Sequence, residues 1–128
     1  MAIVTAHDSP ESASFAPYLA GLRARARRTA QTREVERGLT LDLARRAADL
    51  LRERFGASMV FAFGSLVRPG GFDERSDVDL AVGGVTPDQF FRAWAAVSSV
   101  VDRPLDLVDL DDCPERLRQQ IVTQGVPL

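Results

Sequence analysis

Apolar positions recur along this chain with two periods, one typical of helices and one typical of strands. Residues 12–37 are expected to form a first helix. Its apolar stripe is short, because it ends after Phe15, Leu19 and Leu22 and the later apolar residues are mostly alanine. Gly38 is expected to break the helix, since glycine is unfavourable in a helix interior. A helix with so thin a stripe suits contact with another protein or with a second copy of the chain.

A second helix is expected between Thr40, which can cap its start, and Gly56, which can end it. Apolar side chains at helical spacing form its inner face: Leu41, Ala44, Ala48, Leu51 and Phe55. Two further helices are expected at residues 87–100 and 114–124, and each of them opens with a proline.

Three segments have the pattern of strands. Residues 59–63 are a short apolar run between turn signals, which predicts a buried strand. Residues 77–82 and 105–110 alternate between carboxylate and apolar side chains, as a strand with two different faces does. The order of elements is helix, helix, strand, helical turn, strand, helix, strand, helix. This order predicts an α/β fold in which helices cover a small mixed sheet.

The chain has 128 residues, which suits one compact domain. We expect that domain at residues 39–128, preceded by an N-terminal helical extension at residues 1–38. The net charge of −2 neither favours nor excludes nucleic acid as a partner. All sixteen basic residues are arginine, and six of them crowd the extension between Arg23 and Arg37. This cluster is expected to be a solvated helix face; an interface with protein or RNA is the alternative.

The sequence predicts a cytoplasmic protein with no membrane partner. No apolar run reaches the length of a membrane span. The single cysteine, Cys113, excludes an internal disulfide and fits a reducing compartment. The N-terminal residues lack the basic flank and apolar core of a secretion signal.

The apolar run at residues 59–63 ends in Gly64 and Ser65 and passes into an expected helical turn. A strand that enters such a turn exposes backbone N–H groups, while glycine permits a close approach and serine adds a hydroxyl donor. This arrangement can cradle a phosphate, although Gly-Ser by itself is a common turn pair.

Asp77 and Asp79 are two apart on an expected strand, so their side chains point to the same face. Converging carboxylates need a cation or a proton between them, and Mg²⁺ prefers such oxygens. A solvated edge strand is the alternative for this pair. On the next strand Asp106 is favoured over Asp109, because Asp109 shares its face with leucines that belong in the core. Three carboxylates beside a phosphate cradle can hold two metal ions and a nucleoside triphosphate.

The segment GSLVRPGGFDERSDVDLAV, followed by LDLVDL, resembles the minimal nucleotidyltransferases of the polymerase-β-like superfamily. The resemblance covers about residues 39–128 and includes the closing segment LRQQIVTQGVPL. The chain departs from the family pattern at Pro69, where the family often has glycine.

The resemblance implies a role for each residue that matches the family pattern. The triphosphate is expected at Gly64 and Ser65, with Arg68 facing a phosphate. Two Mg²⁺ ions are expected at three catalytic carboxylates: Asp77, Asp79 and Asp106. The third of these carboxylates is also expected to help remove the proton from the attacking hydroxyl.

The resemblance further implies Mg²⁺-dependent transfer of a nucleoside monophosphate, most often AMP from ATP, to a hydroxyl acceptor. Similar proteins are commonly the antitoxins of bacterial or archaeal toxin–antitoxin pairs. Their usual partner is an RNase toxin of the HEPN class, which receives AMP on a tyrosine. Two alternatives stay open at this point. The chain could neutralise its partner by contact alone, or it could transfer nucleotides to RNA ends or to a small molecule.

Overall fold

The computed structural model describes residues 2–128, with side chains from Phe15 onward. The chain forms two compact units, Met1–Thr32 and Arg33–Leu128. The domain boundary expected at residue 38 stays a prediction. In the first unit, four large apolar side chains are exposed on one helix: Phe15, Tyr18, Leu19 and Leu22. Their spacing places them along one side of that helix.

The helix α1 (Ala2–Phe55) is continuous, so the expected break at Gly38 and the expected start at residue 12 are wrong. Thr40 does not cap a helix; it lies inside α1 with its side chain buried. Glycine in a helix interior costs only about 1 kcal/mol relative to alanine. The residues that follow bury an apolar face that outweighs this cost, consisting of Ala44, Ala47, Ala48 and Leu51. The predicted end of the helix is confirmed, because Gly56 follows it with a φ of +70°.

The sheet has four strands in the order β3-β2-β1-β4. They are β1 (Met59–Phe63), β2 (Val78–Gly83), β3 (Leu105–Asp109) and β4 (Val126–Pro127). β1 pairs antiparallel with β2 and β4, whereas β2 pairs parallel with β3. The mixed sheet and the α/β class are therefore confirmed. The sequence pattern did not predict β4, which is only two residues long.

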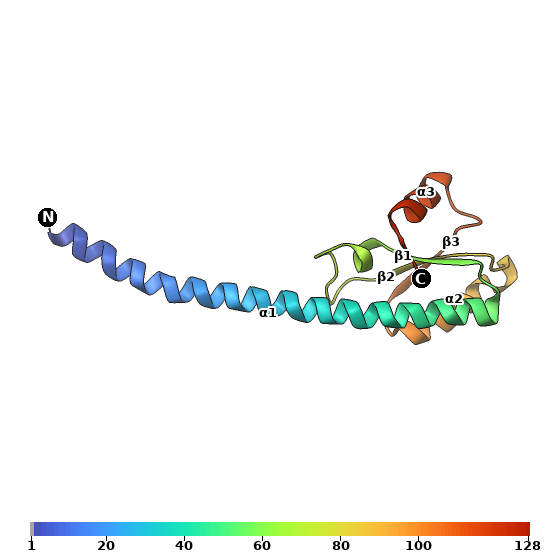
Figure 1. The fold of residues 1–128 in the computed structure, drawn as a ribbon, viewed down its shortest axis with the longest axis horizontal. Coiled ribbons are helices and arrows are strands. Elements are labelled where there is room, and N and C mark those ends of the chain that lie inside the picture. Colours follow the sequence, from blue (N-terminus) through green and yellow to red (C-terminus); the bar gives the residue numbers. More distant parts are fainter. Residues whose placement is uncertain (1) are drawn as a thin grey trace. The chain divides into compact units, whose positions relative to one another are not determined.

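Helices cover both faces of the sheet. Figure 1 shows α3 (Glu115–Gln124) on one side of it and α2 (Pro87–Val101) on the other. The larger core joins α2 and the C-terminal part of α1 to one face of the sheet, with Leu51, Leu80 and Val97 at its centre. The smaller core lies under α3 and includes Ala81 and Ile121. No helix among residues 2–128 is long and apolar enough to cross a membrane.

Candidate active site

The turn after β1 brings the backbone of Gly64 against the side chain of Asp79. Gly64 has a φ of +74°, which L side chains rarely adopt, and it begins the 3₁₀ helix η1 (Gly64–Val67). A Cβ at this position would collide with Oδ2 of Asp79. Only glycine therefore allows the turn to approach the carboxylate this closely, and the predicted helical turn after the strand is confirmed.

Contacts with the interior of the second unit fix the position of η1. Leu66 is fully buried in the larger core. Nη1 of Arg37 donates a hydrogen bond of 3.0 Å to the carbonyl of Leu66. Ser65 lies in the same turn, and its carbonyl accepts a hydrogen bond from the backbone N–H of Arg68. The turn is thus fixed by one apolar side chain and one guanidinium before any ligand binds.

Three side chains form a row across the sheet beside this turn. Asp79 on β2 lies opposite Phe63 on β1 and opposite Asp106 on β3. Strands in a sheet are separated by about 4.8 Å, so the carboxylates of Asp79 and Asp106 are close neighbours. Asp109 lies opposite Val82 instead. The structure therefore brings Asp106, and not Asp109, to the side of Asp79.

The alternation expected for β2 is confirmed. Val78, Leu80 and Val82 are completely buried in the larger core. Asp79 and Ala81 lie on the opposite face, and Ala81 belongs to the smaller core. β2 begins one residue later than predicted, so Asp77 directly precedes the strand.

The electrostatics of Asp79 show which charges surround it. Burial raises the pKa of Asp79 above its ordinary value, and the negative charges of Asp106 and Asp77 raise it further. The guanidinium of Arg68 acts in the opposite direction and lowers this pKa. The structure therefore gathers all three predicted carboxylates and the predicted arginine near Gly64.

The fit of the three carboxylates to a metal ion can be judged from their placement and their chemistry. Among the side chains that the structure describes, no three from aspartate, glutamate, histidine and cysteine form a metal-binding group. The chemistry of the donors still fits Mg²⁺, because carboxylate oxygens are its preferred protein ligands. Burial, and after it the negative charges of Asp106 and Asp77, raise the pKa of Asp79, and a bound cation would offset both effects. The site thus has the charge for a divalent metal ion.

Arg103, which no sequence pattern singled out, holds the segment that leads to Asp77. Its Nη1 donates to the carbonyls of Asp73 (3.0 Å) and Ser76 (2.9 Å). Its guanidinium lies 4.5 Å from the centre of the Phe72 ring. Neither sequence spacing nor a local motif links these residues, because they meet only through the packing of two loops.

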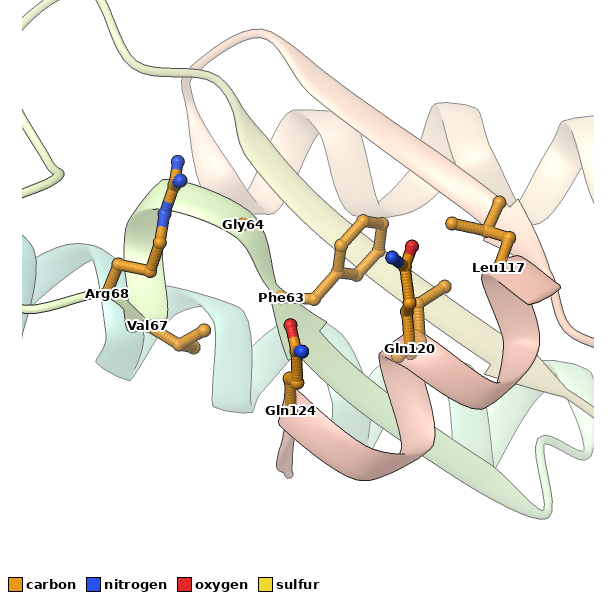
Figure 2. A pocket seen from close by; sticks show the side chains of 8 residues that line it. Phe63, Gly64, Val67, Arg68, Leu117, Gln120 and Gln124 are labelled. Atoms are coloured by element: carbon orange, nitrogen blue, oxygen red, sulfur yellow. The ribbon is translucent and has the colours of Figure 1, made fainter.

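A cavity of about 290 Å³ adjoins the row on the side of α3. Four of its lining residues come from the end of β1 and the η1 turn: Phe63, Gly64, Val67 and Arg68. The other four come from α3: Leu117, Gln120, Ile121 and Gln124. Figure 2 shows Gln120 and Gln124 projecting from α3 toward the strand that carries Phe63. The sequence pattern did not predict this cavity.

Comparison with known proteins adds family information to this geometry. Residues 46–128 match the model of the family described as polymerase beta, nucleotidyltransferase. No curated protein matches the chain significantly.

Several solved structures are similar to the chain. One is a toxin–antitoxin complex with AMP-PNP, with 31% identity, a TM-score of 0.55, and coverage of 62% of this chain and 67% of that one. Another is a tri-AMPylated HEPN toxin from Shewanella oneidensis in complex with its MNT antitoxin, with 26% identity, a TM-score of 0.53, and coverage of 69% and 70%. A third is the MntA–HepT toxin–antitoxin complex, with 27% identity, a TM-score of 0.52, and coverage of 66% and 68%.

Proposed function

The chain belongs to the polymerase beta nucleotidyltransferase family, and from that premise we propose that it transfers AMP from Mg²⁺-ATP to a hydroxyl of a partner protein. The observation that carries this proposal is the row of Asp79 and Asp106 beside Gly64. A phosphate cradle and paired carboxylates on adjoining elements are what nucleotidyl transfer requires. β2 lies between β3 and β1 in the sheet and is not an edge strand, which supports a site over the alternative of a solvated edge strand.

Each group of the site has a chemical task in this proposal. The backbone N–H groups of the turn at Gly64 and Ser65 bind phosphate oxygens, together with the Ser65 hydroxyl and the Arg68 guanidinium. Mg²⁺ is assigned to three carboxylates: Asp77, Asp79 and Asp106. When bound there, two metal ions would supply charge neutralisation for the attacking and leaving oxygens.

The reaction exchanges one phosphorus–oxygen bond for another and moves one proton. The acceptor hydroxyl oxygen attacks the α-phosphorus, and the bond from this phosphorus to the bridging oxygen of the β-phosphate breaks. Pyrophosphate leaves with that oxygen, and Asp106 takes the proton of the hydroxyl. Holding the reactants in line accounts for much of the acceleration in such transfers.

We propose a HEPN-type RNase toxin as the partner and a tyrosine of that toxin as the acceptor. Support comes from the similar Shewanella oneidensis complex, in which a HEPN toxin is AMPylated and bound to an MNT antitoxin. The exposed Phe15, Tyr18, Leu19 and Leu22 suit contact with a protein. The chain would then act as the antitoxin of the pair.

A label-transfer assay tests the proposal. The protein, Mg²⁺ and α-phosphate-labelled ATP are mixed with lysate of the source cells or with the purified toxin. We expect a labelled protein band, which is lost in the Ser65→Ala/Asp77→Asn double variant. The control is Asp88→Asn, because Asp88 is an exposed residue in the first turn of α2. The control should transfer label normally.

Three other outcomes would contradict the proposal in different ways. Label in RNA or in a small molecule would change the acceptor class. Neutralisation of the toxin by the double variant would show that contact alone is sufficient. An absence of transfer from ATP, with transfer from another nucleotide, would replace AMP with a different monophosphate.

A further inference from the structure

The sheet row that carries the carboxylates faces α3, because Phe63 of this row packs against the smaller core. The neighbouring row contains Phe61, Ala81 and Val108, which pack in the smaller core with Ile121 of α3. One step along the strands, the next row contains Phe63, Asp79 and Asp106. The cavity between β1, η1 and α3 begins at this row, because Phe63 and Gly64 line it.

We propose that this cavity binds the nucleoside of the triphosphate and that Gln120 and Gln124 select its base. The proposal rests on the function proposed above and extends the same site. Gly64 and Arg68 belong both to the phosphate cradle and to the wall of the cavity. A triphosphate held by the turn would therefore have its sugar and base within reach of the cavity.

The lining of the cavity matches the chemistry of a nucleobase. The side chains of Phe63, Val67 and Ile121 supply apolar surface, and an aromatic ring can stack on any base. The volume of about 290 Å³ is near the lower end of the range for small-molecule sites, about 300–1,000 Å³. The pocket is thus sized for one small ligand group rather than for a protein segment.

Two carboxamides stand on the α3 side of the cavity. Gln120 and Gln124 are one helical turn apart, so their side chains emerge on the same side of α3 (Figure 2). A glutamine amide offers one acceptor and two donors, and it can pair with the donor and acceptor edge of adenine through two hydrogen bonds. An uncharged pair of this kind can read a base without adding charge beside the phosphates.

Calorimetric titration of the full chain with Mg²⁺ present tests the assignment. The probes are ATP, GTP, CTP, UTP and inorganic tripolyphosphate, which has the phosphates and no nucleoside. The wild type is expected to bind ATP at least about tenfold more tightly than tripolyphosphate, since base stacking and paired hydrogen bonds each contribute on that scale. ATP is also expected to bind more tightly than the other three nucleotides.

The variants Gln120→Ala and Gln124→Ala are expected to weaken ATP binding by about tenfold each. Neither should change tripolyphosphate binding by more than about twofold, because the phosphate cradle is intact. Gln119→Ala is the matched control, since Gln119 is exposed on the same helix and does not line the cavity. Thermal melting of all three variants checks that α3 remains folded.

Each contrary result has a separate meaning. Equal affinity of the wild type for ATP and tripolyphosphate would overturn the nucleoside assignment and leave the proposed function standing. The same follows if Gln120→Ala and Gln124→Ala bind ATP as Gln119→Ala does. Binding of neither ATP nor tripolyphosphate would overturn the proposed function, and the nucleoside assignment with it.

Discussion

The two faces of β2 differ completely in what they contribute. On one face Val78, Leu80 and Val82 are fully buried in the larger core. On the other face Asp79 stands beside Asp106, and its pKa is raised by burial and by neighbouring negative charge. Because side chains alternate along a strand, residues 78–82 anchor the sheet through one face and present Asp79 on the other. The apolar face stabilises the fold that holds two repelling charges together.

The largest effect is expected on the acidic face. Asp79→Asn should reduce nucleotidyl transfer by about 10²–10³-fold, the usual effect of removing one group that stabilises transition-state charge. Initial rates with labelled ATP measure this change, with Asp88→Asn as the control. A rate within about threefold of the wild type, well short of that loss, would remove Asp79 from the site.

The opposite face should respond in stability rather than in rate. Leu80→Ala is expected to lower the free energy of unfolding by about 3–5 kcal/mol, because Leu80 is completely buried. Denaturant unfolding measures this loss. Val122→Ala is the control; Val122 on α3 is 50% exposed and should change stability by less than about 0.5 kcal/mol. At temperatures where Leu80→Ala is folded, its rate per folded molecule should match the wild type.

Substitutions at two glycines distinguish the effect of backbone strain from the effect of a collision with Asp79. Gly64 and Gly70 both have positive φ, but only at Gly64 would a Cβ strike Asp79. Gly64→Ala and Gly70→Ala should each lose about 1–2 kcal/mol of stability. Only Gly64→Ala should also lose transfer, because the carboxylate must move. Equal rates for the two variants would show that the close approach of turn and carboxylate is unimportant for the reaction.

The smallest effect is expected to be a gain in stability when the charge of Asp79 is removed from beside Asp106 and Asp77. The pKa of Asp79 is higher in the folded state, so its ionised form destabilises the protein at pH values above that pKa. Without divalent metal, Asp79→Asn should therefore raise Tm at pH 7, and differential scanning calorimetry measures this shift. The gain should shrink as the pH falls through the raised pKa of Asp79 and disappear below the ordinary value of 3.8, where Asp79 is protonated in both states. A gain independent of pH would point to packing instead of charge.

Local sequence patterns predicted the positions of the candidate site residues, because these positions depend on strand periodicity and turn chemistry. β1 has the predicted bounds, and β2 and β3 are within one residue of theirs. The choice of Asp106 over Asp109 followed from alternation alone, and the register places Asp106 beside Asp79. The roles of the individual residues stay proposals, because placement alone does not establish chemistry.

The features that the sequence did not predict depend on tertiary packing. Gly38 is a local helix breaker, yet the buried face after it keeps α1 continuous. The contacts of Arg103 with Asp73 and Ser76 join loops that are distant in sequence. The cavity lined by Gln120 and Gln124 forms where α3 packs beside the end of β1 and the η1 turn. None of these features has a periodic signal.

The parallel pairing of β2 with β3 makes the acidic row depend on a segment that comes later in the chain. Parallel neighbours cannot be joined by a hairpin, and here the chain crosses over through α2 before β3 begins at Leu105. Such non-local closure is slow relative to helix and hairpin formation. A growing polypeptide therefore carries Asp77 and Asp79 for some time before Asp106 is in place. The row of Asp79 and Asp106 is therefore complete only once the chain has crossed over through α2 and β3 has paired with β2.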